Sequence, residues 1–119
     1  MKLYFYILGK NRKYDVKTGT FEKAVFKMKI EECEVIEKPK TYRAVTKFPE
    51  GLYIGYIRKE DIGRIADSYG EYFIVLEKPN YQFAKEVFLK KYNREINALR
   101  DKISTCEDIV AAIENFKED

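Results

Sequence analysis

The sequence predicts an α+β fold in which an N-terminal antiparallel β-rich part with a short helix precedes a C-terminal helical hairpin. Up to Pro79, short apolar runs are separated by Gly, Pro and Asn, as is typical of strands and turns. After Pro79, the apolar residues recur every 3.6 positions instead of every two, which indicates helix. The 119 residues include ten Tyr and eight Phe, enough to build a core. We therefore expect one domain, residues 1–119, with strands over 1–79 and helices over 80–119.

The β-rich part divides at its turn residues into short elements. Strands are predicted at Leu3–Leu8, Lys13–Lys17, Glu34–Glu37, Thr41–Lys47, Leu52–Arg58 and Glu71–Glu77. The segment Phe21–Ile30 fits a helix or a strand, because its apolar residues satisfy either period; we interpret it as a strand. Lys59–Asp67 has apolar residues at helical spacing and acids near its start, which predicts the short helix.

The C-terminal part is predicted to be two helices. Asn80 is the expected N-cap of a long helix over about 80–103. Its apolar stripe is Tyr81, Ala84, Phe88, Tyr92, Ile96, Leu99 and Ile103. The run Ser104-Thr105-Cys106-Glu107 matches a capping box and predicts a second helix over about 105–117. Its apolar face is Ile109, Ala112, Ile113 and Phe116.

Composition narrows the class of protein. Charged residues make up 36% of the chain, yet the net charge is only +3, too mild to indicate duplex DNA binding by charge alone. This small net charge still allows a local basic pocket that binds a small anion. No run approaches the ~20 apolar residues that cross a bilayer, and the short aromatic N-terminal run indicates a strand rather than a signal peptide. Cys33 and Cys106 lack ligand spacing, so we expect reduced thiols in a cytoplasmic protein.

The residues of common active sites are missing. The chain has no histidine, which removes the commonest general base and metal ligand. Phosphate-binding glycine loops, zinc-protease motifs and calcium loops are also missing from the sequence. We therefore expect a protein that is not an enzyme and has neither metal nor cofactor.

The polar face of the long helix is the first candidate binding surface. At 100° per residue, Phe83 points about 140° away from Phe88, among Lys90, Asn93, Arg94, Asn97 and Arg100. An aromatic ring can stack on a purine, an asparagine amide can pair with an adenine edge, and an arginine can hold phosphate oxygens. Phe83, Asn93 and Arg100 supply one of each. The alternative is that Phe83 packs on the preceding strand while the polar residues are solvated.

The second candidate surface lies where aromatic and basic residues alternate. It comprises Tyr53, Tyr56, Arg58 and Lys59, with Tyr42 and Arg43 nearby. This composition is typical of oligonucleotide-binding sheets. Tyr56 and Arg58 would share one face of a strand. The alternative is a half-buried strand with a polar outer face.

Several of these residues match a known family. The β-rich part with its run Glu37-Lys38-Pro39-Lys40-Thr41-Tyr42, the helical pair, and Phe83 and Asn93 spaced ten residues apart are similar to phage Thoeris anti-defence proteins of the first-described type. Arg58, at the end of its strand, resembles a phosphate-contacting arginine of that family. Arg100 is our inference from its chemistry.

The resemblance implies a function. Such proteins are sponges that sequester a cyclic ADP-ribose isomer made by a TIR enzyme without cleaving it, and some also hold cyclic oligonucleotides such as a cyclic trinucleotide at a separate site. They assemble as dimers or rings of dimers with pockets between protomers. Phe83 would then stack on adenine, Asn93 would bond base or ribose, and Arg58 would neutralise phosphate. The alternatives are a protein-binding phage inhibitor such as an anti-CRISPR, and a small regulator that binds single-stranded nucleic acid.

Overall fold

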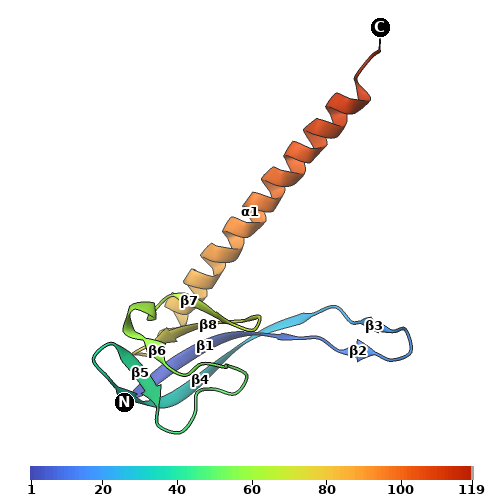
Figure 1. The fold of residues 1–119 in the computed structure, drawn as a ribbon. Helices are drawn as coiled ribbons and strands as arrows, with labels where there is room; N and C mark the ends of the chain where they lie inside the picture. The colour runs from blue at the N-terminus through green and yellow to red at the C-terminus, as the bar shows by residue number, and fades with distance from the viewer. Residues whose placement is uncertain (119) are drawn as a thin grey trace. The chain divides into compact units, whose positions relative to one another are not determined.

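A computed structural model describes residues 1–118 as an α+β chain that divides into two compact units between Lys85 and Glu86 (Figure 1). The first unit holds a sheet and the second is formed by a helix. The strands are β1 (Lys2–Asn11), β2 (Tyr14–Asp15), β3 (Thr20–Phe21), β4 (Val25–Glu37), β5 (Thr41–Ala44), β6 (Ile57–Arg58), β7 (Ile65–Ser68) and β8 (Glu71–Leu76). A 3₁₀ turn, η1 (Lys59–Asp61), follows β6, and the helix α1 runs over Tyr81–Glu114.

The main sheet is antiparallel, with the strand order β6-β5-β4-β1-β8-β7. Strand β1 lies at the centre, where it pairs with β4 on one side and β8 on the other. The pairing of β1 with β4 continues past the sheet to Asn11 and Val25, and the chain between them adds the small β2–β3 ladder. Residues from about 10 to 29 thus form a two-stranded ribbon, which we call the basic ribbon.

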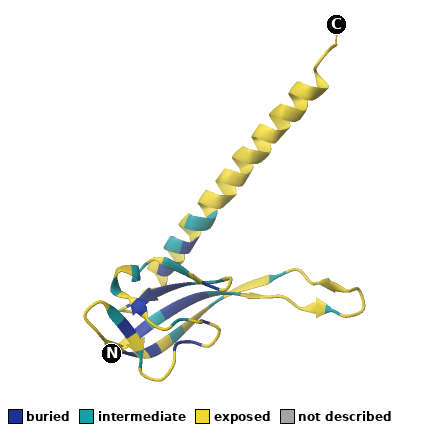
Figure 2. Ribbon diagram, in the orientation of Figure 1, coloured by how far each residue is buried: buried dark blue, intermediate teal, exposed yellow. Residues whose placement is uncertain are grey.

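Both faces of the central strand are covered. Leu3, Phe5 and Ile7 point to one face and pack with Phe73 and with Phe48 from the loop after β5. Tyr6 points to the other face, where its hydroxyl accepts a hydrogen bond from the backbone N–H of Asn80 at 2.8 Å. This alternation produces the dark band of buried residues along the middle strands in Figure 2.

Several predicted strands are confirmed. Leu3–Leu8 and Glu71–Glu77 correspond to β1 and β8. Phe21–Ile30 contains no helix: Phe21 ends β3 and Val25–Ile30 begins β4. Glu34–Glu37 is the end of the same long strand β4, because nothing in the sequence interrupts it before Pro39. Lys13–Lys17 and Thr41–Lys47 contain the shorter strands β2 and β5.

Two predictions between residues 52 and 67 are wrong. Only Ile57–Arg58 of the expected strand Leu52–Arg58 is a strand, because Leu52 turns into the core from an irregular loop between two glycines. The expected helix Lys59–Asp67 stops after η1. The helical path ends at Ile62, whose ψ is 131°, and Gly63 then adopts a positive φ of 80°. Ile65–Ser68 pairs with β8 instead.

The predicted helical hairpin is also wrong. Asn80 is confirmed as N-cap, since its side-chain oxygen accepts a hydrogen bond from the Phe83 N–H at 3.1 Å. The helix then continues through Ser104-Thr105-Cys106-Glu107 to Glu114, so the described residues contain no second helix. The Thr105 hydroxyl donates to the Asp101 carbonyl at 3.0 Å inside the helix, which satisfies it without a cap. No Gly or Pro occurs between residues 81 and 114 to end the helix.

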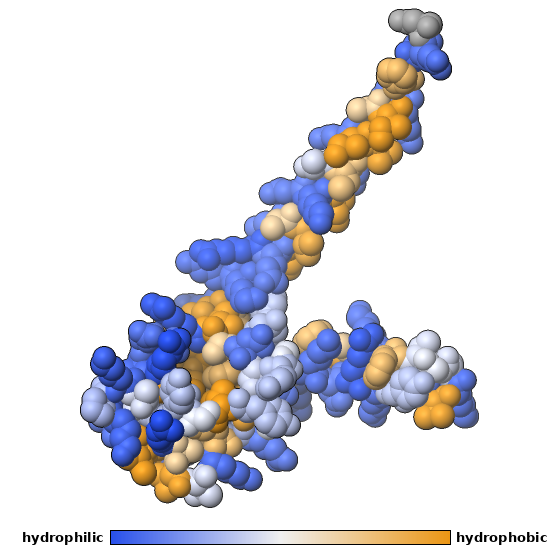
Figure 3. All heavy atoms as spheres, in the orientation of Figure 1, coloured by the Kyte–Doolittle hydropathy of each residue, from blue (hydrophilic) through white to orange (hydrophobic). Residues whose placement is uncertain are grey.

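The helix unit is polar on one side and apolar on the other (Figure 3). It carries both basic and acidic residues, and Lys91 and Glu95 form an i,i+4 ion pair at 2.6 Å. Over residues 1–118, no helix has the length and hydropathy needed to cross a membrane.

Candidate functional site

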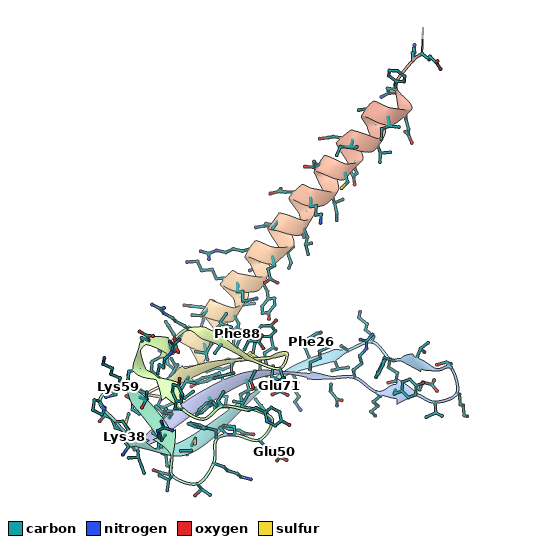
Figure 4. All side chains as sticks on the ribbon, in the orientation of Figure 1. Phe26, Lys38, Glu50, Lys59, Glu71 and Phe88 are labelled. Atoms are coloured by element: carbon teal, nitrogen blue, oxygen red, sulfur yellow. The ribbon has the colours of Figure 1, made fainter. Side chains whose placement is uncertain are left out.

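A pocket of about 800 Å³ lies at the β5–β6 edge of the sheet unit. Four of its eight lining residues are basic and one is aromatic. Its lining is Pro39, Lys40, Thr41, Arg43, Tyr56, Arg58, Lys59 and Glu60. Figure 4 shows Lys59 at this edge. The volume falls in the range of about 300–1,000 Å³ that is usual for small-molecule sites.

Strand pairing explains why the charged side chains gather on one face. Tyr42 pairs with Ile57, and both are buried in the core. Because neighbouring residues of a strand point to opposite faces, Arg43 and Arg58 lie on the outer face. Thr41, directly across from Arg58, lies on that face as well. The hydrophobic residues between the charged ones thus fix the arrangement of the pocket.

Arg43 and Tyr56 contact each other in the lining of the pocket. The guanidinium carbon of Arg43 lies 5.5 Å from the centroid of the Tyr56 ring, a cation–π contact. Tyr56 is 49% exposed, so about half of its surface remains accessible. Within residues 1–118, no carboxylate forms an ion pair with Arg43 or with Lys40. Arg43 can therefore offer its donors to an anion without breaking an ion pair.

The other two cations of the pocket are already paired. Arg58 bonds Asp61 at 2.9 Å and Glu60 at 3.1 Å. The hydrogen bond that Arg58 donates to Asp61, and the negative charges of Asp61 and Glu60, raise the pKa of Arg58. Lys59 bonds Glu37 at 2.9 Å. An incoming phosphate would have to compete with these carboxylates, so Arg58 is a weaker anion ligand than its position in the sequence indicates.

The remaining aromatics of the second candidate surface lie elsewhere. Tyr42 is buried under the pocket, and its hydroxyl donates to Glu77 at 2.8 Å. Burial, together with that hydrogen bond, raises the pKa of Tyr42 to about 12. Tyr53 packs edge-on against Tyr69, with ring centroids 5.4 Å apart. The structure thus gathers Arg43, Tyr56 and the two paired cations, and leaves these tyrosines outside.

The first candidate surface is split between the two units. Phe83 belongs to the sheet unit, is 40% exposed, and has its ring beside the backbone of Gly63. This contact is with the loop between η1 and β7 and not with β8, the strand that precedes the helix. The polar residues Asn93, Arg94, Asn97 and Arg100 belong to the helix unit and are exposed. Their joint action with Phe83 stays a prediction.

Sequence reasoning placed too little weight on two residues. Lys40 was not among the candidates, and Arg43 was only a neighbour of the run around Tyr56. The signal for Arg43 was its alternation with the buried Tyr42 on a strand that turns back at Lys38-Pro39. Nothing in the sequence showed which arginine would be paired by carboxylates.

No metal site accompanies the pocket in the described part of the chain, where no three His, Cys, Asp or Glu side chains are grouped to hold an ion. No protein-family model matches this chain, and neither a curated protein nor a solved structure is detectably similar to it.

Proposed function

We propose that this protein binds a small anionic nucleotide in the β5–β6 pocket and sequesters it without cleaving it. The observation that carries the proposal is the pairing of Arg43, which has no carboxylate partner in the described chain, with the half-exposed ring of Tyr56. An accessible aromatic face can stack on a base, and a guanidinium beside it can hold two phosphate oxygens. The pocket thus offers both parts of a nucleotide a partner.

The absence of histidine from the sequence supports binding rather than catalysis. A sink for a signal molecule requires affinity and no bond cleavage. The carboxylates at the pocket, Glu60 and Asp61, are held by Arg58 and are poor candidates for a general base. We therefore propose that the protein is not an enzyme.

The resemblance to the Thoeris anti-defence proteins suggests the ligand. We propose a phage protein that acts in the cytoplasm of the host, where it removes a TIR-derived cyclic ADP-ribose isomer before the effector senses it. Such an isomer carries an adenine for Tyr56 and a diphosphate for Arg43. A cyclic trinucleotide is the second ligand to try, since it offers bases for stacking and phosphodiester oxygens for Arg43. As in that family, we propose a homo-oligomer.

Thermal shift tests the ligand class. A ligand that binds only the folded protein stabilises it by RT ln(1 + [L]/Kd), so a cyclic ADP-ribose isomer should raise the Tm by several degrees. Arg43→Ala and Tyr56→Ala should abolish the shift. Lys78→Ala, which removes one exposed charge far along the chain from the pocket, should keep it. If no nucleotide shifts the Tm, a protein partner becomes the better explanation and the proposal fails.

The role of Phe83 and Asn93 in ligand binding is tested by substituting each of them. If the resemblance extends to the site, Phe83→Ala and Asn93→Ala should weaken binding of the same ligand while the fold is retained. Calorimetry on both variants measures this. Unchanged affinity in both would remove Phe83, Asn93 and the neighbouring Arg94, Asn97 and Arg100 from the site, and would leave Arg43 and Tyr56 untouched.

The basic ribbon favours a second candidate function, binding of single-stranded nucleic acid. Between residues 10 and 29 the sequence has seven Lys or Arg against two carboxylates, a larger excess than that of the whole chain. Exposed aromatic rings lie among these charges, at Tyr14, Phe21 and Phe26; Figure 4 labels Phe26. Arg12 stacks over the Phe21 ring at 5.2 Å. Stacking surfaces within basic grooves are typical of single-strand binders.

Salt dependence separates the two functions. Affinity for a long polynucleotide held by the ribbon should fall steeply with salt, and Lys13→Ala with Lys17→Ala should flatten that slope. A small ligand in the β5–β6 pocket should show a shallow slope that these substitutions leave unchanged. Fluorescence titration over a series of salt concentrations distinguishes them.

A further inference from the structure

The helix α1 carries a long apolar stripe that its own unit leaves uncovered. Leu99 is 60% exposed and Ile113 is 68% exposed, and Leu89, Ile96, Ile103 and Val110 are also exposed. Figure 3 shows hydrophobic side chains gathered along one side of the helix. A contiguous apolar surface of this kind on a water-exposed helix marks an interaction site.

The stripe follows a heptad repeat. Steps of four and three residues alternate from Leu89 to Ile113, which is the spacing of core positions in a coiled coil. The a positions are Leu89, Ile96, Ile103 and Val110, and the d positions are Tyr92, Leu99, Cys106 and Ile113. A repeat of 3.5 residues over more than three heptads distinguishes this seam from the 3.6 period of a helix that packs on a sheet. β-branched residues at a favour two strands.

The charges beside the seam identify the second strand as another copy of the same helix. In parallel coiled coils, a g residue meets the e residue of the next heptad in the partner. Here Glu95 at g would meet Arg100 of a second copy, and Lys102 at g would meet its Glu107. Both pairs have opposite charges, and two-fold symmetry doubles them. Glu95 already bonds Lys91 in its own helix and can accept from both cations.

The same charges disfavour the reverse orientation. An antiparallel alignment that keeps all the seam residues paired places e beside e and g beside g. Arg100 would then face its own copy, and so would Lys102. Like charges at these positions destabilise that alignment, so the sequence distinguishes parallel from antiparallel.

We infer that α1 pairs with the α1 of a second copy as a parallel, in-register, two-stranded coiled coil over residues 89–113. At 1.5 Å per residue the seam is about 36 Å long. The pairing assigns Arg100 to the interface between the two helices. It specifies the geometry of the homo-oligomer and does not depend on which ligand the pocket holds.

Cys106 provides a direct test of orientation and register. It occupies a d position, so a parallel in-register pair brings two Cys106 residues within the Cα separation of about 4.4–6.8 Å that a disulfide spans. An antiparallel pair would place Cys106 opposite Ile96. The other cysteine, Cys33, is buried in the sheet unit.

The expected result is a particle of twice the 14.2 kDa chain mass by light scattering, which copper-catalysed oxidation converts to a covalent dimer. Cys106→Ser should remain a dimer and should lose the cross-link, while Cys33→Ser should keep both. A monomer, a trimer, or a dimer that Cys106 fails to cross-link would overturn the proposal.

Charge exchange tests the e–g pairs. Lys102→Glu and Glu107→Lys each replace an attractive pair with a repulsive one on both sides, and each should raise the dimer dissociation constant about tenfold. The double variant should restore it, and mixing the two single variants should give a heterodimer tighter than either homodimer. Equal stability of all four species in sedimentation equilibrium would contradict the parallel assignment.

A seam substitution completes the test. Ile103→Asp places a charge in the seam and should give a monomer, whereas Ser104→Asp, one residue away at a solvent-facing position, should stay dimeric. The helix of the monomeric variant can fray, so near-ultraviolet circular dichroism of the tyrosines of the sheet unit serves as the folding control. An Ile103→Asp dimer with an intact sheet unit would contradict the seam.

Discussion

At the residue scale, the buried hydroxyl of Tyr42 links the pocket strand to Glu77, the residue that follows β8. Its pKa is raised from 10 to about 12 in the folded chain, so the neutral form is favoured there. The resulting stabilisation is complete below pH 10 and is lost as the pH rises toward 12, because the unfolded chain ionises first. Wild type should lose about 2–3 kcal/mol of unfolding free energy over this range beyond the loss seen in Tyr42→Phe. Urea unfolding at each pH measures this, and parallel curves for the two proteins would refute it.

Gly63 is a second residue with a predictable effect on stability, which arises from its backbone conformation. Its φ of 80° is costly for any residue with a Cβ, so Gly63→Ala should destabilise the fold by about 1–2 kcal/mol. A Cβ there would meet the Phe83 ring at 3.5 Å, an ordinary contact, so the cost arises from the backbone and not from a clash. Gly55→Ala, at a site with no positive φ and open space, is the matched control. Equal Tm values for the two variants would contradict this assignment.

At the element scale, the first turn of α1 depends on Asn80. Asn80→Ala removes the side-chain oxygen that caps the Phe83 N–H and should lower the unfolding free energy by about 1 kcal/mol. Asn97→Ala, at an exposed position inside the helix, should be neutral or slightly stabilising, because alanine has the higher helix propensity. Denaturant unfolding of both variants checks the difference, which should vanish if the cap is not formed in solution.

Local patterns predicted the elements with strong periodicity and missed those decided by distant contacts. The alternation in β1 and β8 and the cap at Asn80 could be read from the sequence, since each depends on neighbours along the chain. The loop at Leu52 could not, because its path follows a hydrogen bond from the Tyr53 N–H to Ser68. The Ser104–Glu107 capping box failed because a capping pattern cannot end a helix that no residue interrupts.

The candidate site likewise has features that follow from local sequence patterns and features that depend on how side chains pair in the fold. Alternating aromatic and basic residues located the pocket around Tyr56 and Arg58. Which arginine stays available depends on Asp61 and Glu60, whose side chains turn back onto Arg58. The sequence therefore indicated the composition of the pocket but not the ion pairs of Arg58, and the role of Arg58 as a ligand residue stays a prediction.

At the scale of the whole molecule, the pocket and the coiled-coil seam are separate features. All lining residues of the pocket lie between positions 39 and 60 of one chain. Ile103→Asp should therefore yield a monomer that binds the ligand with unchanged affinity and one site per chain. If pockets instead form between protomers, as the resemblance implies, this variant should lose binding. Calorimetry on the monomeric variant decides between the two arrangements.

The central claim is that Arg43 and Tyr56 hold a nucleotide, and calorimetric titration with a cyclic ADP-ribose isomer tests it most directly. Wild type and Lys78→Ala should bind the ligand saturably and release it unchanged. Arg43→Ala should weaken binding at least about tenfold, because it removes charged hydrogen bonds to phosphate. Equal affinity in Arg43→Ala and Lys78→Ala, or no heat of binding in the wild type, would contradict the account.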